Sequence, residues 1–325
     1  MKFVIVGAGA LGSIIAGHLA KAGQDVTLVA RGKRAAFLKE NGITLTGLVD
    51  CTTPCNIVED VGEIRTADVL IIAVKTYDMD GVLAAVNHID VASVLSVQNG
   101  VLKNEQLEAV FGKEKVLGAA GFFSGELLPD GAARFTLNSR FCMGEWPEGT
   151  SPRVNDIVDV MAASGIHSEA LDMMQSVEWS KFISWIGLMV PAVLTRVETY
   201  KYLSNAQTAT ICARMMREGA ALANTLGIPL EDTVPLPVKS IAEGSEQKAI
   251  ETLLQLGAMM AKNAPTHRVS TLQDLESGKN LEVEETLGYV LKKAREKGVP
   301  VPTVDTCYRL ISAIDHTISQ QLGNP

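Results

Sequence analysis

Near the N-terminus, three glycines recur at a spacing that can hold phosphate groups. The residues are Gly7-Ala8-Gly9-Ala10-Leu11-Gly12, a G-x-G-x-x-G motif between an aliphatic run and a segment with helical periodicity. In that context Gly7 permits a tight turn, Gly9 lets the backbone approach a pyrophosphate, and Gly12 lets helix and strand pack closely. The N-terminus of the helix adds free N–H groups and a positive dipole end. The motif therefore predicts a dinucleotide site, the alternative being a chance grouping of glycines.

The end of the second predicted strand, residues 26–29, indicates which dinucleotide is bound. Sites for NAD place an Asp or Glu there, which accepts hydrogen bonds from the ribose 2′-hydroxyl. This chain continues instead with Ala30-Arg31-Gly32-Lys33-Arg34, which holds three cations and no acid. A guanidinium binds a 2′-phosphate through paired hydrogen bonds, so the sequence favours NADPH. The alternative is a basic turn that faces solvent.

Polar residues also follow two later strands. Lys75 comes directly after Val74, and Asn99 follows Val97-Gln98. Ligands of open α/β sheets bind beyond the carboxyl ends of the strands. We therefore expect Lys75 to neutralise a cofactor phosphate, and Asn99 to bind ribose, nicotinamide or substrate. A surface lysine and an Asn-Gly turn would give the same sequence and remain open as alternatives.

Lys181 stands at the start of an apolar stretch, residues 182–194, which predicts a buried helix. Lysine is rarely buried without a partner, and an ammonium group withdrawn from water is a better proton donor. The alternative is a lysine that extends from the helix entrance to water. The stretch is shorter than the roughly 18 residues of a membrane span, so we expect no membrane contact.

The order of the predicted elements indicates an α/β fold. Residues 1–171 alternate strands with helices, as expected of a Rossmann-like doubly wound sheet, and we assign them to an NADP-binding domain. Residues 172–325 form an all-helical C-terminal domain that would carry substrate and catalytic groups. Its predicted helices cover residues 173–194, 205–226, 246–263 and 283–297.

The composition narrows the class of protein. With 325 residues, 47% of them hydrophobic, the chain can bury a large core, and a net charge of −8 argues against a nucleic-acid binder. Five scattered cysteines do not form a disulfide framework, and Cys51 and Cys55 lack the second pair that a structural metal site needs. We therefore expect no metal, a reducing compartment, and a soluble cytoplasmic protein without a targeting segment.

Several motifs together resemble one family over nearly the whole chain, the ketopantoate reductases (2-dehydropantoate 2-reductases). They are the glycine motif, Arg31, Val74-Lys75-Thr76, Val97-Gln98-Asn99-Gly100, Trp179-Ser180-Lys181 and Ser270-Thr271-Leu272-Gln273-Asp274. This family reduces a 2-oxo acid with NADPH. The resemblance implies an NADP-dependent oxidoreductase of pantothenate biosynthesis, with a small-molecule substrate and a cleft between its domains. A homodimer is compatible with it.

The resemblance also implies roles for individual residues. Lys181 matches the general acid, and Glu282 matches the carboxylate that partners the lysine and the substrate. Asn99 matches an asparagine that holds cofactor and substrate, and Ser270 a serine that binds substrate. Arg31 and Lys75 match cations that contact NADPH.

The chain departs from the family's pattern after the catalytic lysine. Typical members have asparagines four and commonly eight residues further on, where this sequence has Trp185 and Met189. By helical spacing both side chains can share the face of Lys181 and line the substrate site, although an aromatic residue can also turn into the core. This favours a 2-oxo acid with an apolar tail, or another substrate on the same fold. A non-catalytic NADPH-binding protein is a further alternative, against which Lys181 and Glu282 argue.

Overall fold

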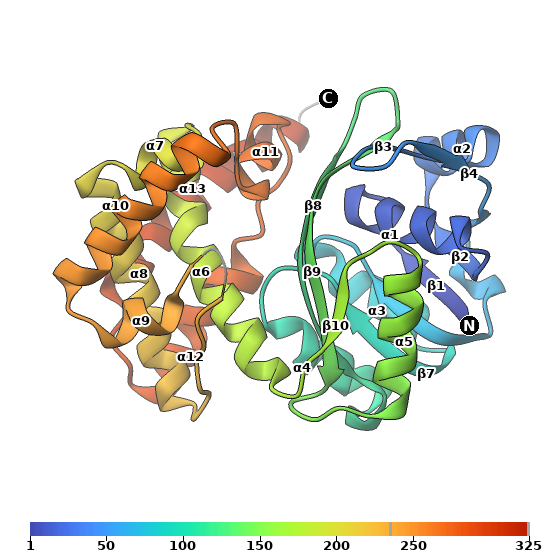
Figure 1. Ribbon diagram of the computed structural model, residues 1–325, viewed down its shortest axis with the longest axis horizontal. Coiled ribbons are helices and arrows are strands. Elements are labelled where there is room, and N and C mark those ends of the chain that lie inside the picture. Colours follow the sequence, from blue (N-terminus) through green and yellow to red (C-terminus); the bar gives the residue numbers. More distant parts are fainter. Residues whose placement is uncertain (234–235, 324–325) are drawn as a thin grey trace. The chain divides into compact units, whose positions relative to one another are not determined.

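The computed structural model describes residues 1–233 and 236–323, and the chain divides into two compact units (Figure 1). The first comprises Met1–Gln98 and Lys103–Gln175, and the second Asn99–Leu102 and Ser176–Pro325. The first unit contains all the strands, and the second is helical, which confirms the predicted fold class. The four residues Asn99–Leu102 group with the helical unit although the α/β unit flanks them in sequence.

The first unit is built on a parallel sheet with the strand order β5-β2-β1-β6-β7. Its strands are β1 (Lys2–Val6), β2 (Asp25–Val29), β5 (Asn56–Val58), β6 (Thr66–Ile72) and β7 (Asp90–Ser96). The central strand β1 has a continuous apolar run, Phe3-Val4-Ile5, because both of its faces are covered. After β1 the chain adds β2 and β5 on one side of it and then β6 and β7 on the other side. Sheets of this type bind ligands at such a topological switch point.

Helices cover both faces of this sheet. They are α1 (Ala10–Lys21), α2 (Gly32–Asn41), α3 (Met79–Val86) and α4 (Leu102–Phe111). Ile14 and Ile15 of α1 pack in one core with Phe3 and Ile5. On the other face, Leu83 and Leu107 join a second core with Val4 and Leu70.

A second sheet lies beyond α1, with the order β10-β9-β3-β4 and with β8 paired to β9. Its strands are β3 (Ile43–Gly47), β4 (Cys51–Thr53), β8 (Leu117–Leu127), β9 (Ala133–Glu145) and β10 (Ser168–Ala170). The strands β8 and β9 form the long green hairpin of Figure 1. Phe135 of β9 and Val154 of α5 (Pro152–Ala163) pack in the same core as α1, so α1 is enclosed between the two sheets.

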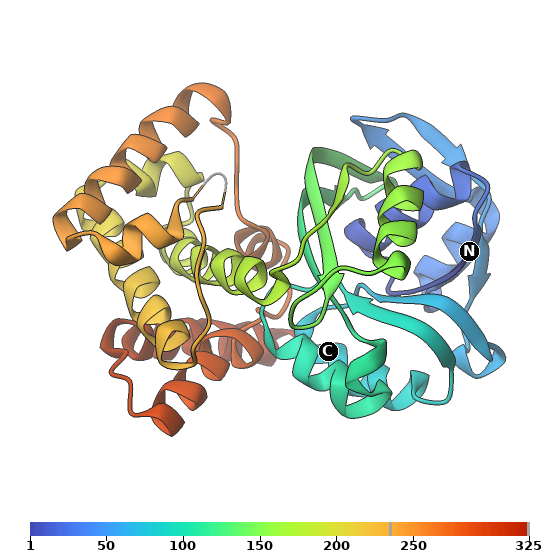
Figure 2. The same ribbon diagram turned by 60° about the horizontal axis from the view of Figure 1, so that its bottom comes forward.

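The second unit surrounds the apolar helix α6 (Met174–Thr195), which Figure 2 shows in yellow-green between the orange α10 and the red C-terminal helices. The other helices are α7 (Thr199–Leu203), α8 (Ala206–Thr225), α9 (Val238–Glu243), α10 (Glu246–Asn263), α11 (Ser270–Glu276), α12 (Tyr289–Lys297) and α13 (Pro302–Gly323). By length and composition α6 could cross a membrane, but 83% of its apolar window is buried inside the protein, as expected of a core helix. A Cβ atom on Gly187 would lie 2.6 Å from Met216, so the missing side chain lets α6 approach α8 closely.

Candidate active site

The glycine loop after β1 has the geometry that a pyrophosphate requires. Gly7 has a φ of +112°, and a Cβ atom there would lie 2.7 Å from the carbonyl oxygen of Ala73. A Cβ on Gly12 would lie 1.9 Å from the carbonyl oxygen of Gly7, so neither position admits a side chain. Gly9 is exposed, and a Cβ there would have no atom within 4 Å. The backbone at Gly9 is therefore open to a phosphate group at the N-terminus of α1, and the loop fits a dinucleotide.

The remaining residues of the loop hold it in place. Ala8 is buried, Ala10 begins α1, and Leu11 is half-buried against the core of the first unit. The carbonyl oxygen of Ala8 accepts hydrogen bonds from Ser13 Oγ at 3.2 Å and from Arg34 Nε at 3.0 Å. Two bonds to one carbonyl fix the orientation of the loop.

The structure corrects the prediction that three cations after β2 are free for a 2′-phosphate. Arg34 also donates to Gly131 O at 2.6 Å and to Ser13 Oγ at 2.9 Å. Its guanidinium thus supports the glycine loop through these hydrogen bonds. Burial lowers the pKa of this guanidinium below its ordinary value. Arg31 precedes α2 as its N-cap residue, and both Arg31 and Lys33 are exposed. Arg31 and Lys33 thus remain candidates for phosphate contact, whereas Arg34 does not.

The ends of β6 and β7 are joined by the side chain of Gln98. Its Nε2 donates to the carbonyl oxygen of Lys75 at 3.1 Å, and its Oε1 accepts from Ser96 Oγ at 3.1 Å. Lys75 is half-buried at the start of a short 3₁₀ turn, Thr76–Asp78. Gln98 therefore links the backbone at two neighbouring strand ends, and the contact of Lys75 with a cofactor stays a prediction.

A buried lysine that the sequence analysis missed supports the same strand end. Lys103 on α4 is 4% exposed. Its Nζ donates to the carbonyl oxygens of Ser96 at 2.9 Å, Gln98 at 3.2 Å and Ala119 at 2.7 Å. These acceptors offset the cost of burying the charge. Nothing in the local sequence, Leu102-Lys103-Asn104-Glu105, distinguishes this residue from a surface lysine.

In the second unit the structure brings Lys181 and Asn99 together. Lys181 is half-buried on α6, and its Nζ donates to Asn99 Oδ1 at 3.1 Å. Gly100, with a φ of +91°, then turns the chain beside Thr286, whose Cγ2 would lie 3.6 Å from a Cβ on Gly100. Asn99 and Gly100 thereby connect the lysine of α6 to the segment that precedes α12.

That segment carries the predicted carboxylate. Glu282 is 4% exposed, and Thr286 donates its hydroxyl hydrogen to the carbonyl oxygen of Glu282. The helix predicted over residues 283–297 begins as a π-helix, Glu284–Gly288, before α12. Single π-helical turns of this kind are frequent at functional sites.

The other predicted substrate residues also belong to the second unit. Ser270 is the half-buried first residue of α11, and its contact with substrate stays a prediction. Trp185 is half-buried on α6, with its ring packed against the helical core. Met189 is 0% exposed within that core, so the expectation that it lines the substrate site is wrong. Met189 belongs to the apolar core of the helical unit.

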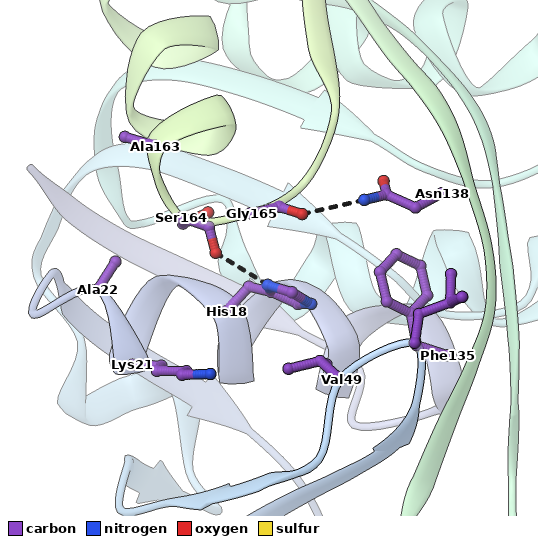
Figure 3. A pocket seen from close by; sticks show the side chains of 10 residues that line it. His18, Lys21, Ala22, Val49, Phe135, Asn138, Ala163, Ser164 and Gly165 are labelled. Carbon is purple, nitrogen blue, oxygen red and sulfur yellow. Dashed lines mark hydrogen bonds between the residues drawn. The ribbon is translucent and has the colours of Figure 1, made fainter.

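A hollow of about 410 Å³ lies in the first unit at the C-terminal end of α1, opposite the glycine loop (Figure 3). His18 lines it and is 5% exposed, and its Nδ1 donates to Ser164 O at 2.9 Å, since a carbonyl can only accept. His18 Nε2 is buried without a hydrogen-bond partner. Asn138 is engaged with Gly165 O and with His167 N, at 3.0 Å each. These contacts connect α1, β9 and α5, and they indicate a structural role.

Cys51 and Cys55 are free thiols in different surroundings. Cys51 begins β4, whereas the Cys55 thiol donates to Val26 O at 3.5 Å, and burial raises the pKa of this thiol to about 11. Throughout residues 1–233 and 236–323, no three His, Cys, Asp or Glu side chains are placed to hold a metal ion.

A parallel sheet with an open glycine loop, followed by a separate helical unit with a partnered lysine, defines a dinucleotide-dependent oxidoreductase of the Rossmann type. Two family models match the chain: Ketopantoate reductase PanE/ApbA over residues 3–148, and its C-terminal counterpart over residues 173–315. The chain therefore belongs to the ketopantoate reductase family.

Individual relatives agree with this assignment. A 2-dehydropantoate 2-reductase of Archaeoglobus fulgidus is 28% identical over 311 residues, which cover 96% of this chain and 97% of the relative. The crystal structure of a PanE/ApbA family ketopantoate reductase from Ralstonia eutropha is 24% identical, with a TM-score of 0.83 and coverage of 98% and 100%. The ternary structure of D-mandelate dehydrogenase with NADH and anilino(oxo)acetate shares the fold at 18% identity, with a TM-score of 0.83 and the same coverage.

Proposed function

We propose that this protein reduces a 2-oxo acid to the corresponding 2-hydroxy acid with NADPH. The observation that carries the proposal is the 3.1 Å hydrogen bond from Lys181 Nζ to Asn99 Oδ1. It holds a proton donor, half-buried on a core helix, beside the polar side chain that follows strand β7. The name of the Archaeoglobus fulgidus relative makes 2-dehydropantoate (ketopantoate) the first substrate to test.

The residues after β2 support NADPH as the cofactor. The strand ends at Val29 without an acid beyond it, and Arg31 and Lys33 are exposed near its end. A carboxylate would repel a 2′-phosphate, whereas Arg31 can bind it through two hydrogen bonds. The backbone at Gly9 would contact the pyrophosphate, and Lys75 would neutralise a phosphate charge.

Four residues of the second unit have parts in the proposed proton transfer. The bound cofactor supplies the hydride. The ammonium of Lys181 stabilises the negative charge that develops on the carbonyl oxygen and then donates a proton from Nζ to it. Asn99 orients Lys181, Glu282 provides the compensating negative charge, and Ser270 orients the substrate carboxylate. The neutral amine of Lys181 regains its proton from solvent after turnover.

The test is NADPH oxidation in the presence of a panel of 2-oxo acids, with Lys181→Ala compared with the exposed Lys262→Ala. We expect Lys181→Ala to lower kcat by roughly 10²–10⁴-fold, as is typical when a general acid is lost. NADPH affinity, measured by fluorescence titration, should be unchanged in both variants. A Lys181→Ala enzyme with the kcat of Lys262→Ala would refute the role of this lysine.

A further inference from the structure

One face of α6 is accessible to solvent, and Lys181 lies on it. Within residues 176–193, every residue is buried except Lys181, Trp185 and Leu188. They are spaced four and three apart, which places their side chains on the same face of the helix. We name these three residues the α6 stripe. At a rise of about 1.5 Å per residue, the stripe runs about 10 Å from Lys181 to Leu188.

Beyond Lys181 the accessible surface of this stripe is carbon. The only polar atom of the Trp185 side chain, Nε1, is buried without a hydrogen-bond partner. The accessible part of its half-buried indole is therefore ring carbon. Leu188 adds an aliphatic surface one turn further on. The stripe thus has a charged end and an apolar end.

The serines near the stripe do not add a polar group to it. Ser180 Oγ accepts a hydrogen bond from the backbone N–H of Glu231 at 3.0 Å, and Ser184 Oγ donates to Ser180 O at 2.8 Å. Both serines are buried. A hydroxyl on a ligand that lies along Trp185 and Leu188 would meet no accessible polar atom on either side chain.

From this arrangement we propose that the substrate carries an apolar tail, which packs on Trp185 and Leu188 while its carbonyl oxygen meets Lys181. The inference rests on the proposed function and specifies its substrate class: a branched or aryl 2-oxo acid without a hydroxyl on its tail. Burial of a hydroxyl without a partner forfeits binding energy, whereas a methyl group in the same place gains it. Trp185 and Leu188 are therefore specificity-determining residues.

The direct test uses two substrates that differ in a single group. Ketopantoate has a terminal hydroxymethyl group, and 3,3-dimethyl-2-oxopentanoate has an ethyl terminus of nearly the same size. We expect the wild-type enzyme to show a kcat/KM roughly tenfold to a hundredfold higher for the second compound. Phenylpyruvate and 4-methyl-2-oxopentanoate complete the panel. Equal values for the matched pair, or a preference for ketopantoate, would overturn the inference.

Variants test the residues themselves. Trp185→Asn and Leu188→Asn should each reduce the preference for 3,3-dimethyl-2-oxopentanoate by at least about fivefold, because an amide can pair with the hydroxyl. Leu194→Asn, an exposed position on the same helix outside the stripe, should leave the preference unchanged. If Trp185→Asn does not fold, Trp185→Phe replaces it. This variant removes Nε1 together with the five-membered ring but keeps an aromatic carbon surface, so it should retain a preference for 3,3-dimethyl-2-oxopentanoate. Loss of that preference would overturn the assignment of the Trp185 ring carbons to the tail of the substrate.

The two levels of the proposal fail separately. If no 2-oxo acid of the panel supports NADPH oxidation, the proposed function is wrong, and the inference falls with it. If the acids are reduced but ketopantoate is preferred, the function stands and the assignment of the stripe is wrong.

Discussion

Lys181 Nζ lies 3.1 Å from Asn99 Oδ1, although 82 residues separate them in the chain. A lysine ammonium can only donate, so this contact directs the amide oxygen of Asn99 toward Lys181 and turns the amide nitrogen away from it. Asn99 belongs to the four-residue segment that groups with the helical unit. The contact therefore joins the residue after the last strand of the parallel sheet to the core helix α6.

Replacement of Asn99 should impair turnover more than cofactor binding. In Asn99→Ala, Lys181 loses an acceptor that fixes its direction, and we expect kcat to fall by roughly tenfold to a hundredfold. Asn263→Ala, at the exposed end of α10, is the matched control and should be unaffected. Steady-state kinetics and NADPH titration measure the two effects. A variant with full kcat would mean that the hydrogen bond does not position the proton donor.

Two arginines after β2 should differ in their effect on cofactor choice. Arg31→Glu is expected to weaken NADPH binding by roughly a hundredfold and NADH binding by less than about threefold, because only NADPH has the 2′-phosphate. Arg34→Ala should weaken both cofactors to the same extent, because Arg34 supports the loop through the carbonyl oxygen of Ala8. Fluorescence titration of both variants with both cofactors checks this. Equal losses for NADPH and NADH in Arg31→Glu would contradict the preference.

Loss of the buried lysine on α4 should destabilise the first unit. Lys103→Met leaves the carbonyl oxygens of Ser96, Gln98 and Ala119 without the ammonium donor. We expect the free energy of unfolding to fall by about 2–5 kcal/mol, measured by urea denaturation. Lys115→Met removes a lysine whose ion pair with Asp90 is largely exposed and should cost less than about 1 kcal/mol. Similar stabilities for the two variants would show that the buried bonds contribute little.

The stability of the protein should depend on the protonation of His18. Burial lowers the pKa of His18 from its ordinary 6.5, and the charge of Lys21 acts in the same direction, against the hydrogen bond to Ser164. As the pH falls below about 6.5, the unfolded chain binds a proton at this histidine before the folded protein does. The neutral His18 side chain therefore contributes to the stability of the folded state above pH 6.5. Below pH 6.5 the free energy of unfolding falls by up to about 1.4 kcal/mol for each pH unit, because the unfolded chain binds the proton more tightly.

Comparison with a variant isolates this site from the other histidines. His18→Gln retains a polar side chain that does not titrate, so its unfolding free energy should decline less between pH 7 and pH 5 than that of the wild type. Urea denaturation at several pH values measures the difference. Parallel declines would indicate that His18 is protonated equally in the folded and unfolded chains.

Short-range patterns determined much of the fold. The G-x-G-x-x-G motif locates the first turn, because the steric need for glycine at Gly7 and Gly12 arises from atoms close to them in the strand and helix. Helical periodicity predicts α10 at Glu246–Asn263 with the bounds that the structure shows. These elements depend on residues three or four positions apart, which a sequence displays directly.

Other parts of the fold depend on contacts between distant segments. The structure pairs β8 and β9 into one long antiparallel hairpin, a pairing that the predicted alternation of strands and helices in residues 1–171 does not specify. The helix α13, Pro302–Gly323, lies within the predicted all-helical domain but is not among the four helices that periodicity predicts there. Strand pairing and helix docking are decided by packing partners far away in the chain, and local propensity does not contain them.

The same division applies to the candidate site. Residue types and motif order identified Lys181, Asn99 and Glu282, but only the tertiary structure decided which atoms these residues meet. In the structure, Arg34 donates to the carbonyl oxygen of Ala8, and Met189 is buried in the helical core. Lys103 donates to three carbonyl oxygens. A sequence specifies what a side chain can bind, whereas the partner it binds is set by the packing of elements that lie far apart along the chain.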